Sequence, residues 1–258
     1  MSRFVNLELG GESEDHGHGT KPLVKDESYY FAEAGSAFEN GLFETALRLY
    51  SKVLEFNAEN AAAWTGQVRM LIELGEFSEA KLWADKALER FPHEPELLAA
   101  KAVALGRIGD LAGALAFSDA AIEERGDTPY VWLARGDVLL AREESRSDYC
   151  FEKALLLAPR NWFVNWLAAR IRLYYQQFAL AMKLLQQALE WNAGHFLLWL
   201  ELGQCQSELG LLAPAAKSLA QARQLNPQSV EADRALARLS EASSLGRRFR
   251  GWWRRIFR

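Results

Sequence analysis

The sequence predicts an all-α solenoid, that is, an array of stacked antiparallel helix hairpins. Three series of mostly small residues, each repeating at 33 or 34 residues, predict this fold class. The series are Ala46, Ala80, Ala114, Ala181 and Ala215 (with one double step); Val53, Ala87, Ala121, Ala154, Ala188 and Ala222; and Ala34, Val68, Ala102, Gly136, Ala169 and Gly203. A fixed period of this length is typical of stacked helical hairpins, in which small residues mark the points where helices approach closely.

The elements run in order from an acidic segment to an arginine-rich tail. Residues 1–26 contain no apolar run, and we expect them to be flexible. Six hairpin units follow, at 27–60, 61–94, 95–128, 129–161, 162–195 and 196–229. Pro95 and Pro129 stand at the start of the third and fourth units, where a first-turn proline favours a helix N-terminus.

Two units depart from the pattern. The fourth is one residue short, and its segment 141–147 lacks the turn glycine that other units have at, for example, Gly75, so we expect a rebuilt turn there. The fifth has Asn165 where other units have an aromatic residue, and its tryptophan is displaced by one place to Trp166. One place turns a side chain by about 100° around a helix, so this indole is predicted to face the groove instead of the core.

The chain beyond the last unit divides into two parts. Residues 230–244 are predicted to form a capping helix that covers the last hairpin. Residues 245–258 break the repeat pattern but place apolar side chains on one helical face with arginines over much of the remainder. We expect this tail to dock as an amphipathic helix on an anionic membrane, a protein partner or the chain's own groove, and these alternatives stay open. The predicted docking residues are Phe249, Arg250, Trp252, Trp253, Arg254, Arg255, Ile256 and Phe257.

The residues between the small positions resemble the tetratricopeptide repeat (TPR) family. Unit 61–94 shows the family pattern in Trp64, Val68, Leu71, Gly75, Phe77, Ala80, Ala84, Ala87 and Pro92. Unit 196–229 matches through Phe196, Trp199, Leu202, Gly203, Gly210, Ala215, Ala222 and Pro227. The resemblance covers about four-fifths of the chain. It implies a right-handed superhelix whose inner wall is formed by the first helix of each unit and binds a protein partner.

Family geometry assigns the second, fifth, sixth, ninth, twelfth and thirteenth places of each unit to this inner wall. Large side chains at these places in the last three units predict a partner-binding groove: Tyr130, Leu133, Phe163, Trp166, Arg170, Tyr174, Leu197 and Leu200. Tighter superhelical packing, with several of these residues against neighbouring repeats, is the competing interpretation. The Lys/Asn/Arg clamp by which some such domains grip chaperone C-terminal carboxylates has no match, because its places hold Phe31, Gly35, Ala32, Gly66, Glu96 and Ala100.

Charge and composition bear on the class of function. The net charge is −4; residues 1–27 carry −3 and residues 246–258 carry +6, which leaves −7 for the repeat body. An acidic body disfavours nucleic-acid binding outside the tail. Cys150 and Cys205 are interpreted as small buried residues, and the pair His16 and His18 lacks a third metal ligand. No cofactor, metal site or catalytic residue set is predicted, so we expect no enzyme.

Three functions fit these observations. The first is a non-enzymatic adaptor that binds a partner peptide or helix in its groove. The second is a peripheral membrane scaffold recruited by residues 245–258, and the third is a regulatory subunit of a separately encoded enzyme. The absence of a signal segment or membrane span predicts a cytoplasmic protein, peripheral at the membrane if the tail binds lipid.

Overall fold

The computed structural model describes residues 25–241, which contain helices and no strand. The predicted all-α fold is therefore confirmed for this part of the chain. Twelve helices form six hairpins, and a further helix, residues 230–241, extends to the end of the described part. The hairpins are α1 (Glu27–Glu39) with α2 (Phe43–Phe56), α3 (Ala61–Glu73) with α4 (Phe77–Arg90), α5 (Pro95–Ile108) with α6 (Leu111–Glu123), α7 (Pro129–Ala141) with α8 (Ser147–Leu157), α9 (Trp162–Tyr174) with α10 (Phe178–Trp191), and α11 (Phe196–Glu208) with α12 (Leu212–Leu225).

The first helix of each hairpin begins at the first residue of a predicted unit. Local capping explains several of these starts. The side chains of Asp26, Asn60 and Thr128 each accept a hydrogen bond from the backbone N–H three residues later. Pro95 and Pro129 supply the first helical residue of α5 and α7, where a missing N–H costs nothing. The repeat period is therefore reinforced by a helix-start signal at most unit boundaries.

Small side chains hold the hairpins together. Ala80, Ala84 and Ala87 lie on one stripe of α4 and are fully buried, as is Val68 on the facing helix α3. Gly203 shows how close the helices come, because a Cβ there would lie 2.6 Å from Leu219 Cγ. Such nesting leaves no space for larger side chains, which is why the small residues recur with the period of the hairpin.

The irregular fourth turn keeps a left-handed residue, as in the other hairpins, but without a glycine. In four hairpins the turn between the two helices contains a glycine with positive φ, at Gly41, Gly75, Gly109 and Gly210. Glu143 takes this left-handed conformation in the fourth hairpin, with φ 58°, and Gln176 takes it in the fifth, with φ 57°. The connection from 142 to 146 is longer than the others, and α8 has only 11 residues. The fourth unit is therefore one residue short because α8 is shorter than the other second helices, although the turn before α8 is longer.

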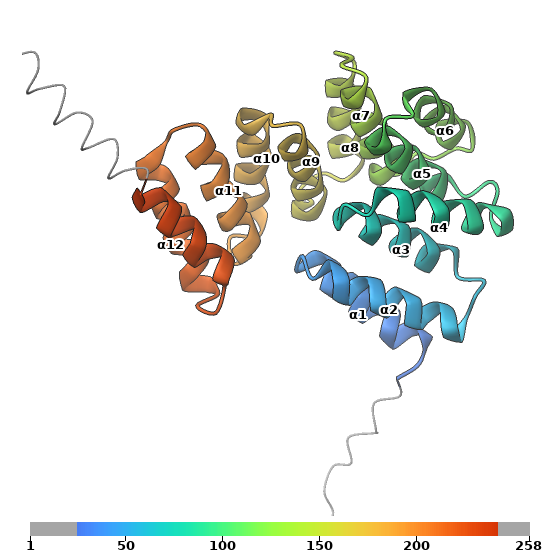
Figure 1. Cartoon of the computed structure of the whole chain (residues 1–258), viewed down its shortest axis with the longest axis horizontal. Coiled ribbons are helices and arrows are strands. Elements are labelled where there is room, and N and C mark those ends of the chain that lie inside the picture. The colour runs from blue at the N-terminus through green and yellow to red at the C-terminus, as the bar shows by residue number, and fades with distance from the viewer. Residues whose placement is uncertain (1–24, 242–258) are drawn as a thin grey trace, which may run out of the picture.

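Stacking is uneven along the array, and the array curls. The helices α2 and α3, α4 and α5, and α10 and α11 pack closely, whereas α9 touches α8 only marginally. Polar contacts bridge this junction: Arg172 pairs with Asp148, and Tyr175 donates a hydrogen bond to Asp137. The curl brings the first hairpin (blue in Figure 1) back toward α9. The inner face is therefore enclosed by hairpins that are distant in the sequence.

Candidate functional site on the inner face

The candidate site is a pocket of about 240 Å³ between the first helices of the second to fifth hairpins, which we call the inner pocket. The helices α3, α5, α7 and α9 supply most of its lining, and the turn before α4 completes it. Its wall combines aromatic rings with charged groups. The side chains used below are Arg69, Glu73, Phe77, Arg107, Tyr130, Asp137, Arg170 and Tyr174.

A buried ion pair forms one side of the inner pocket. Arg107 donates two hydrogen bonds to Asp137, from Nε at 3.0 Å and from Nη2 at 2.6 Å. Their side chains are 6% and 3% exposed, so the pair is screened very little by solvent. Burial works against the charged guanidinium, but the Asp137 carboxylate outweighs it and raises the pKa of Arg107. The guanidinium also stacks 3.2 Å from the centre of the Tyr174 ring, which fixes that ring at the pocket edge.

A second arginine joins three hairpins. Arg170 contacts Glu73 Oε2 through Nη2 at 2.7 Å and Glu201 Oε1 through Nη1 at 2.7 Å. The Trp166 indole N–H donates to the other oxygen of Glu201 at 2.9 Å. Burial opposes the charge on Arg170, yet the two carboxylates together raise its pKa. Glu73 lies 97 residues before Arg170, so this network closes the array across its inner face.

Arg69 differs from the two other arginines of the inner pocket. Its guanidinium lies 3.8 Å from the centre of the Tyr130 ring and 5.0 Å from that of Phe38. Within residues 25–241 it forms no ion pair, whereas Arg107 and Arg170 are both neutralised by carboxylates. The inner pocket therefore holds one half-buried cation whose charge is not matched by the part of the chain described here.

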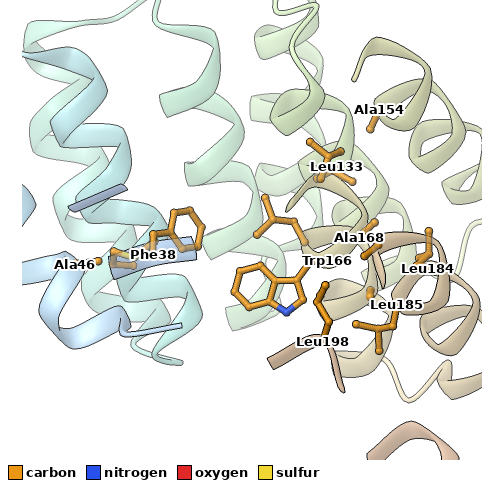
Figure 2. Close-up of a cluster of buried hydrophobic side chains, with 14 of the residues drawn as sticks. Phe38, Ala46, Leu133, Ala154, Trp166, Ala168, Leu184, Leu185 and Leu198 are labelled. Atoms are coloured by element: carbon orange, nitrogen blue, oxygen red, sulfur yellow. The ribbon is translucent and has the colours of Figure 1, made fainter. Parts of the chain in front are cut away.

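Aromatic side chains seal the inner face beside the pocket. Phe38 packs edge-on against Phe163 at 5.1 Å between ring centres, and Phe43 stacks on Trp166 at 6.4 Å. Figure 2 shows Trp166 among the buried side chains, with Phe38 of the first hairpin on one side and Leu198 of α11 on the other. Trp166 is fully buried as a result.

The structure divides the predicted groove residues into two groups. Tyr130, Leu133, Arg170 and Tyr174 line the inner pocket, although Leu133 is only 1% exposed. The others lie in packed contacts: Phe163 and Trp166 against the first hairpin, Leu197 beside Gly41, and Leu200 in the core between α11 and α12.

The expectation of an open wall is therefore corrected for Leu133, Trp166 and Leu200, which are buried. Tighter superhelical packing, the competing interpretation, describes these three side chains. The prediction that Trp166 faces the groove instead of the core is also wrong, because this indole is fully buried in a core cluster against Phe38 and Phe43 of the first hairpin.

Sequence reasoning missed the charged half of the inner pocket. Arg69 and Asp137 occupy the ninth place of their units, and Glu73 and Arg107 occupy the thirteenth. These are inner-wall places of the same rule that selected Arg170 and Tyr174. Large side chains in the last three units select Arg170 and Tyr174, but they do not select the short Asp137 or any residue of the second and third units. A search for opposite charges at places nine and thirteen of adjacent units finds Arg107 with Asp137. It misses the pair of Glu73 with Arg170, which lies three units away, and Arg69 has no ion pair among the described residues.

Other expectations concern residues outside the inner pocket. Cys150 and Cys205 are free and buried, as the sequence predicted. The predicted tail residues, from Phe249 to Phe257, and the pair His16 and His18 lie outside residues 25–241. In that range no group of three or more potential ligands is placed to hold a metal ion, and no helix is both long and apolar enough to cross a bilayer.

Comparison with known families identifies the repeat. The tetratricopeptide repeat model matches residues 37–104 and 172–239, which together make up just over half of the chain. The chain therefore belongs to the tetratricopeptide repeat family. The unmatched middle contains the shortened α8 and its weak junction with α9. No curated protein matches the sequence.

Several solved structures share the fold. The APC/C hetero-tetramer Cut9–Hcn1 aligns with a TM-score of 0.53 at 15% identity, over 83% of this chain and 43% of the other. The human IFIT1 dimer with m7Gppp-AAAA aligns with a TM-score of 0.52 at 19% identity, over 82% and 55%. PilW, a type IV pilus biogenesis factor, aligns with a TM-score of 0.51 at 17% identity, over 81% and 98%. This chain thus spans less than half of Cut9–Hcn1, and at these identities the likeness concerns the fold alone.

Proposed function

We propose that this protein is a non-enzymatic interaction scaffold that binds a segment of a partner protein at the inner pocket. Membership of the tetratricopeptide repeat family supports the class of function, because stacked hairpins present extended inner surfaces suited to peptides and helices. The observation that carries the site is Arg69, a half-buried cation between two aromatic rings without an ion pair in residues 25–241.

The chemistry of the inner pocket favours an acidic side chain next to an apolar one. A carboxylate of the partner would meet the Arg69 guanidinium, and hydrogen bonds to a charged group of this kind are stronger than neutral ones. Tyr174 is 50% exposed at the pocket edge and offers a ring for apolar contact. A volume of about 240 Å³ accommodates one or two side chains, so the pocket would anchor a longer segment that runs along the surface.

RNA is the less favoured ligand class for the repeat body. Human IFIT1, which shares the fold, was solved with a capped RNA fragment. The body of this chain carries a net charge of −7, and two of the three arginines in the inner pocket are already paired. Phosphate binding gains its affinity from unpaired cations, of which the inner pocket has one among the described residues. We therefore propose a protein partner in preference to nucleic acid.

Site-specific photocrosslinking tests this proposal in the full-length protein. A photoreactive phenylalanine analogue replaces Tyr174, which is 50% exposed on the inner face, or Tyr149, which is 62% exposed on α8 outside the inner pocket. The protein is irradiated in lysate of its own cells and adducts are identified by mass spectrometry. We expect one defined protein adduct at position 174 and none of that mass at position 149. The same adduct at both positions would contradict binding at the inner pocket.

Substitutions then locate the contact. Arg69→Gln should reduce the yield of the adduct at position 174 by removing the cation, while Arg48→Gln, at an exposed arginine of α2, should leave it unchanged. Trp166→Ala is unsuitable for this purpose, because Trp166 is fully buried and its loss would disturb the packing. Equal adduct yields from the Arg69 and Arg48 variants would remove Arg69 from the site.

A further inference from the structure

The last described helix, residues 230–241, exposes a face that every other first helix buries. Its residue Ala237 continues the third series of small residues, 34 residues after Gly203. The six earlier members of that series, Ala34, Val68, Ala102, Gly136, Ala169 and Gly203, are all buried. Ala237 is exposed. In the fourth and sixth units the position is covered by the second helix of the same hairpin, since Phe151 covers Gly136 and Leu219 covers Gly203.

The sequence after residue 241 is in register with a second helix. The second helix of the sixth hairpin, α12, begins at Leu212, and 34 residues later stands Gly246. The turn between α11 and α12 has three residues, 209–211, and residues 243–245 correspond to it. Position and connection length therefore suit the second helix of a seventh hairpin.

The apolar residues of this segment fall on the buried positions of α12. The positions of Ala215, Ser218, Leu219 and Ala222, which are all buried, correspond to Phe249, Trp252, Trp253 and Ile256. Its six arginines correspond to Ala213, Pro214, Ala216, Ala220, Gln221 and Gln224, of which only Gln221 is half-buried and the rest are exposed. The register thus puts five of the six arginines on exposed positions and Arg255 on a half-buried one. Phe257, at the exposed position of Arg223, is the apolar residue that departs from it.

Large side chains at these positions have precedents within the molecule. Trp252 corresponds to Trp83 of α4, and Ile256 corresponds to Val53 of α2. Trp253 corresponds to Phe151, which is 3% exposed and packs on Gly136. Phe249 has no such precedent, because its counterparts are alanines and Ser147.

We infer that residues 246–258 form the second helix of a seventh hairpin and cover the Ala237 face of helix 230–241. The tail then completes a seventh hairpin, with Trp253 over Ala237 and a row of arginines directed to solvent. The assignment of residues 246–258 to the Ala237 face rests on register, connection length and the exposure of Ala237. It is independent of what the inner pocket binds. A lipid bilayer or another protein as the tail's partner would leave the agreement with α12 unexplained.

Disulfide trapping in the full-length protein tests the inference. Ala237→Cys is combined with Trp253→Cys, whose counterpart Leu219 packs on Gly203, or with Arg254→Cys, whose counterpart Ala220 is exposed. The two pairs have almost the same tether length, so an undocked tail would crosslink both at the same rate. We expect the disulfide between positions 237 and 253, mapped by mass spectrometry, to form several-fold faster under mild oxidation, because a disulfide needs Cβ atoms about 4 Å apart.

Hydrogen exchange of helix 230–241 supplies a second measurement, made without any introduced cysteine. Trp253→Ala should accelerate exchange in this helix, whereas Phe257→Ala, at a solvent position of the register, should leave it unchanged. Equal crosslinking of the two cysteine pairs would overturn the inference, as would equal exchange in the two alanine variants. Flotation of the full-length protein with phosphatidylserine vesicles, together with equal crosslinking, would assign the tail to a lipid surface instead.

Discussion

At the residue scale, the repeat period predicts the left-handed residue of the hairpin turn where that residue is glycine, but not where it is another residue type. The recurring glycines predict a left-handed turn residue in four hairpins, and segment 141–147, which lacks such a glycine, predicts a rebuilt turn. Glu143 and Gln176 nevertheless adopt the same backbone conformation. Tertiary packing of the two flanking helices imposes it, so the glycine is favourable there without being required. Such an override is invisible in the sequence because it depends on the neighbours of the turn.

Gln176→Gly should therefore stabilise the protein. A left-handed residue other than glycine costs about 1–2 kcal/mol, while the added freedom of glycine in the unfolded chain costs about 0.4–1 kcal/mol. The balance is a gain of about 0.5–1 kcal/mol in the free energy of unfolding, measured by urea denaturation. Gly75→Gln is the matched reverse change, since a Cβ there meets no atom within 4 Å and only φ, at 81°, opposes it. A stable Gly75→Gln variant would show that the turn carries no strain.

A second prediction at this scale concerns His195, whose ring lies against that of Trp162, with 4.7 Å between the ring centres and a tilt of 34°. Both of its ring nitrogens are buried without a hydrogen-bond partner among the described residues. Burial lowers the pKa of the imidazole below its usual 6.5, although the backbone of Glu39 acts in the opposite direction.

The sign of the pH effect follows from the lowered pKa. The unfolded chain binds the proton more readily, so the stability contributed by neutral His195 is complete above about pH 6.5 and is lost as the pH falls through the folded pKa. His195→Phe keeps a ring on Trp162 and removes the titration. As the pH falls from about 7.5 to about 5.5, the unfolding free energy of the native protein should decrease relative to that of this variant. A constant difference would contradict the lowered pKa.

At the element scale, charges at fixed places of the repeat join the first helices to neighbouring helices. Lys101 and Arg135 hold the seventh place of their units and reach back to Asp85 and Asp119 of the preceding helix. Arg107 instead lies on the inner face and reaches forward to Asp137 in the next unit. The unit boundaries and helices follow from the period, but these pairs do not, because a period of small residues says nothing about which polar groups face each other.

Burial sets the energetic weight of these pairs. Asp137→Ala leaves the Arg107 guanidinium buried and uncompensated, which should lower the free energy of unfolding by about 3–5 kcal/mol. Asp119→Ala breaks the Arg135 pair, whose side chains are 21% and 48% exposed, and should cost about 0–1 kcal/mol. Both are measured by chemical denaturation, and the second serves as the control. Similar losses in the two variants would mean that water reaches Arg107 in the folded protein.

At the scale of the whole molecule, the array closes on itself, and this could not be predicted from the sequence. The contact of Phe38 with Phe163 and the pair of Glu73 with Arg170 join residues about a hundred positions apart. Their formation depends on the rotation from each hairpin to the next and on the interruption between α8 and α9, and small differences in rotation accumulate along the array. The same closure buried Trp166, which the repeat pattern alone placed on an open wall.

Closure should make distant hairpins depend on each other. In an open solenoid each repeat contacts only its neighbours, so a substitution in α9 leaves the first hairpin unaffected. Here Phe163→Ala removes a ring that packs on Phe38. The first hairpin should then lose about 1.5 kcal/mol of stability, which corresponds to about tenfold faster hydrogen exchange in α1 and α2. Phe117→Ala, in the local cores around α5 and α6, is the control and should leave exchange in the first hairpin unchanged. Accelerated exchange only in α9 and its sequence neighbours would contradict this prediction and would mean that α3 alone holds the first hairpin. The inner face would then open without cost to partners much larger than a single peptide segment.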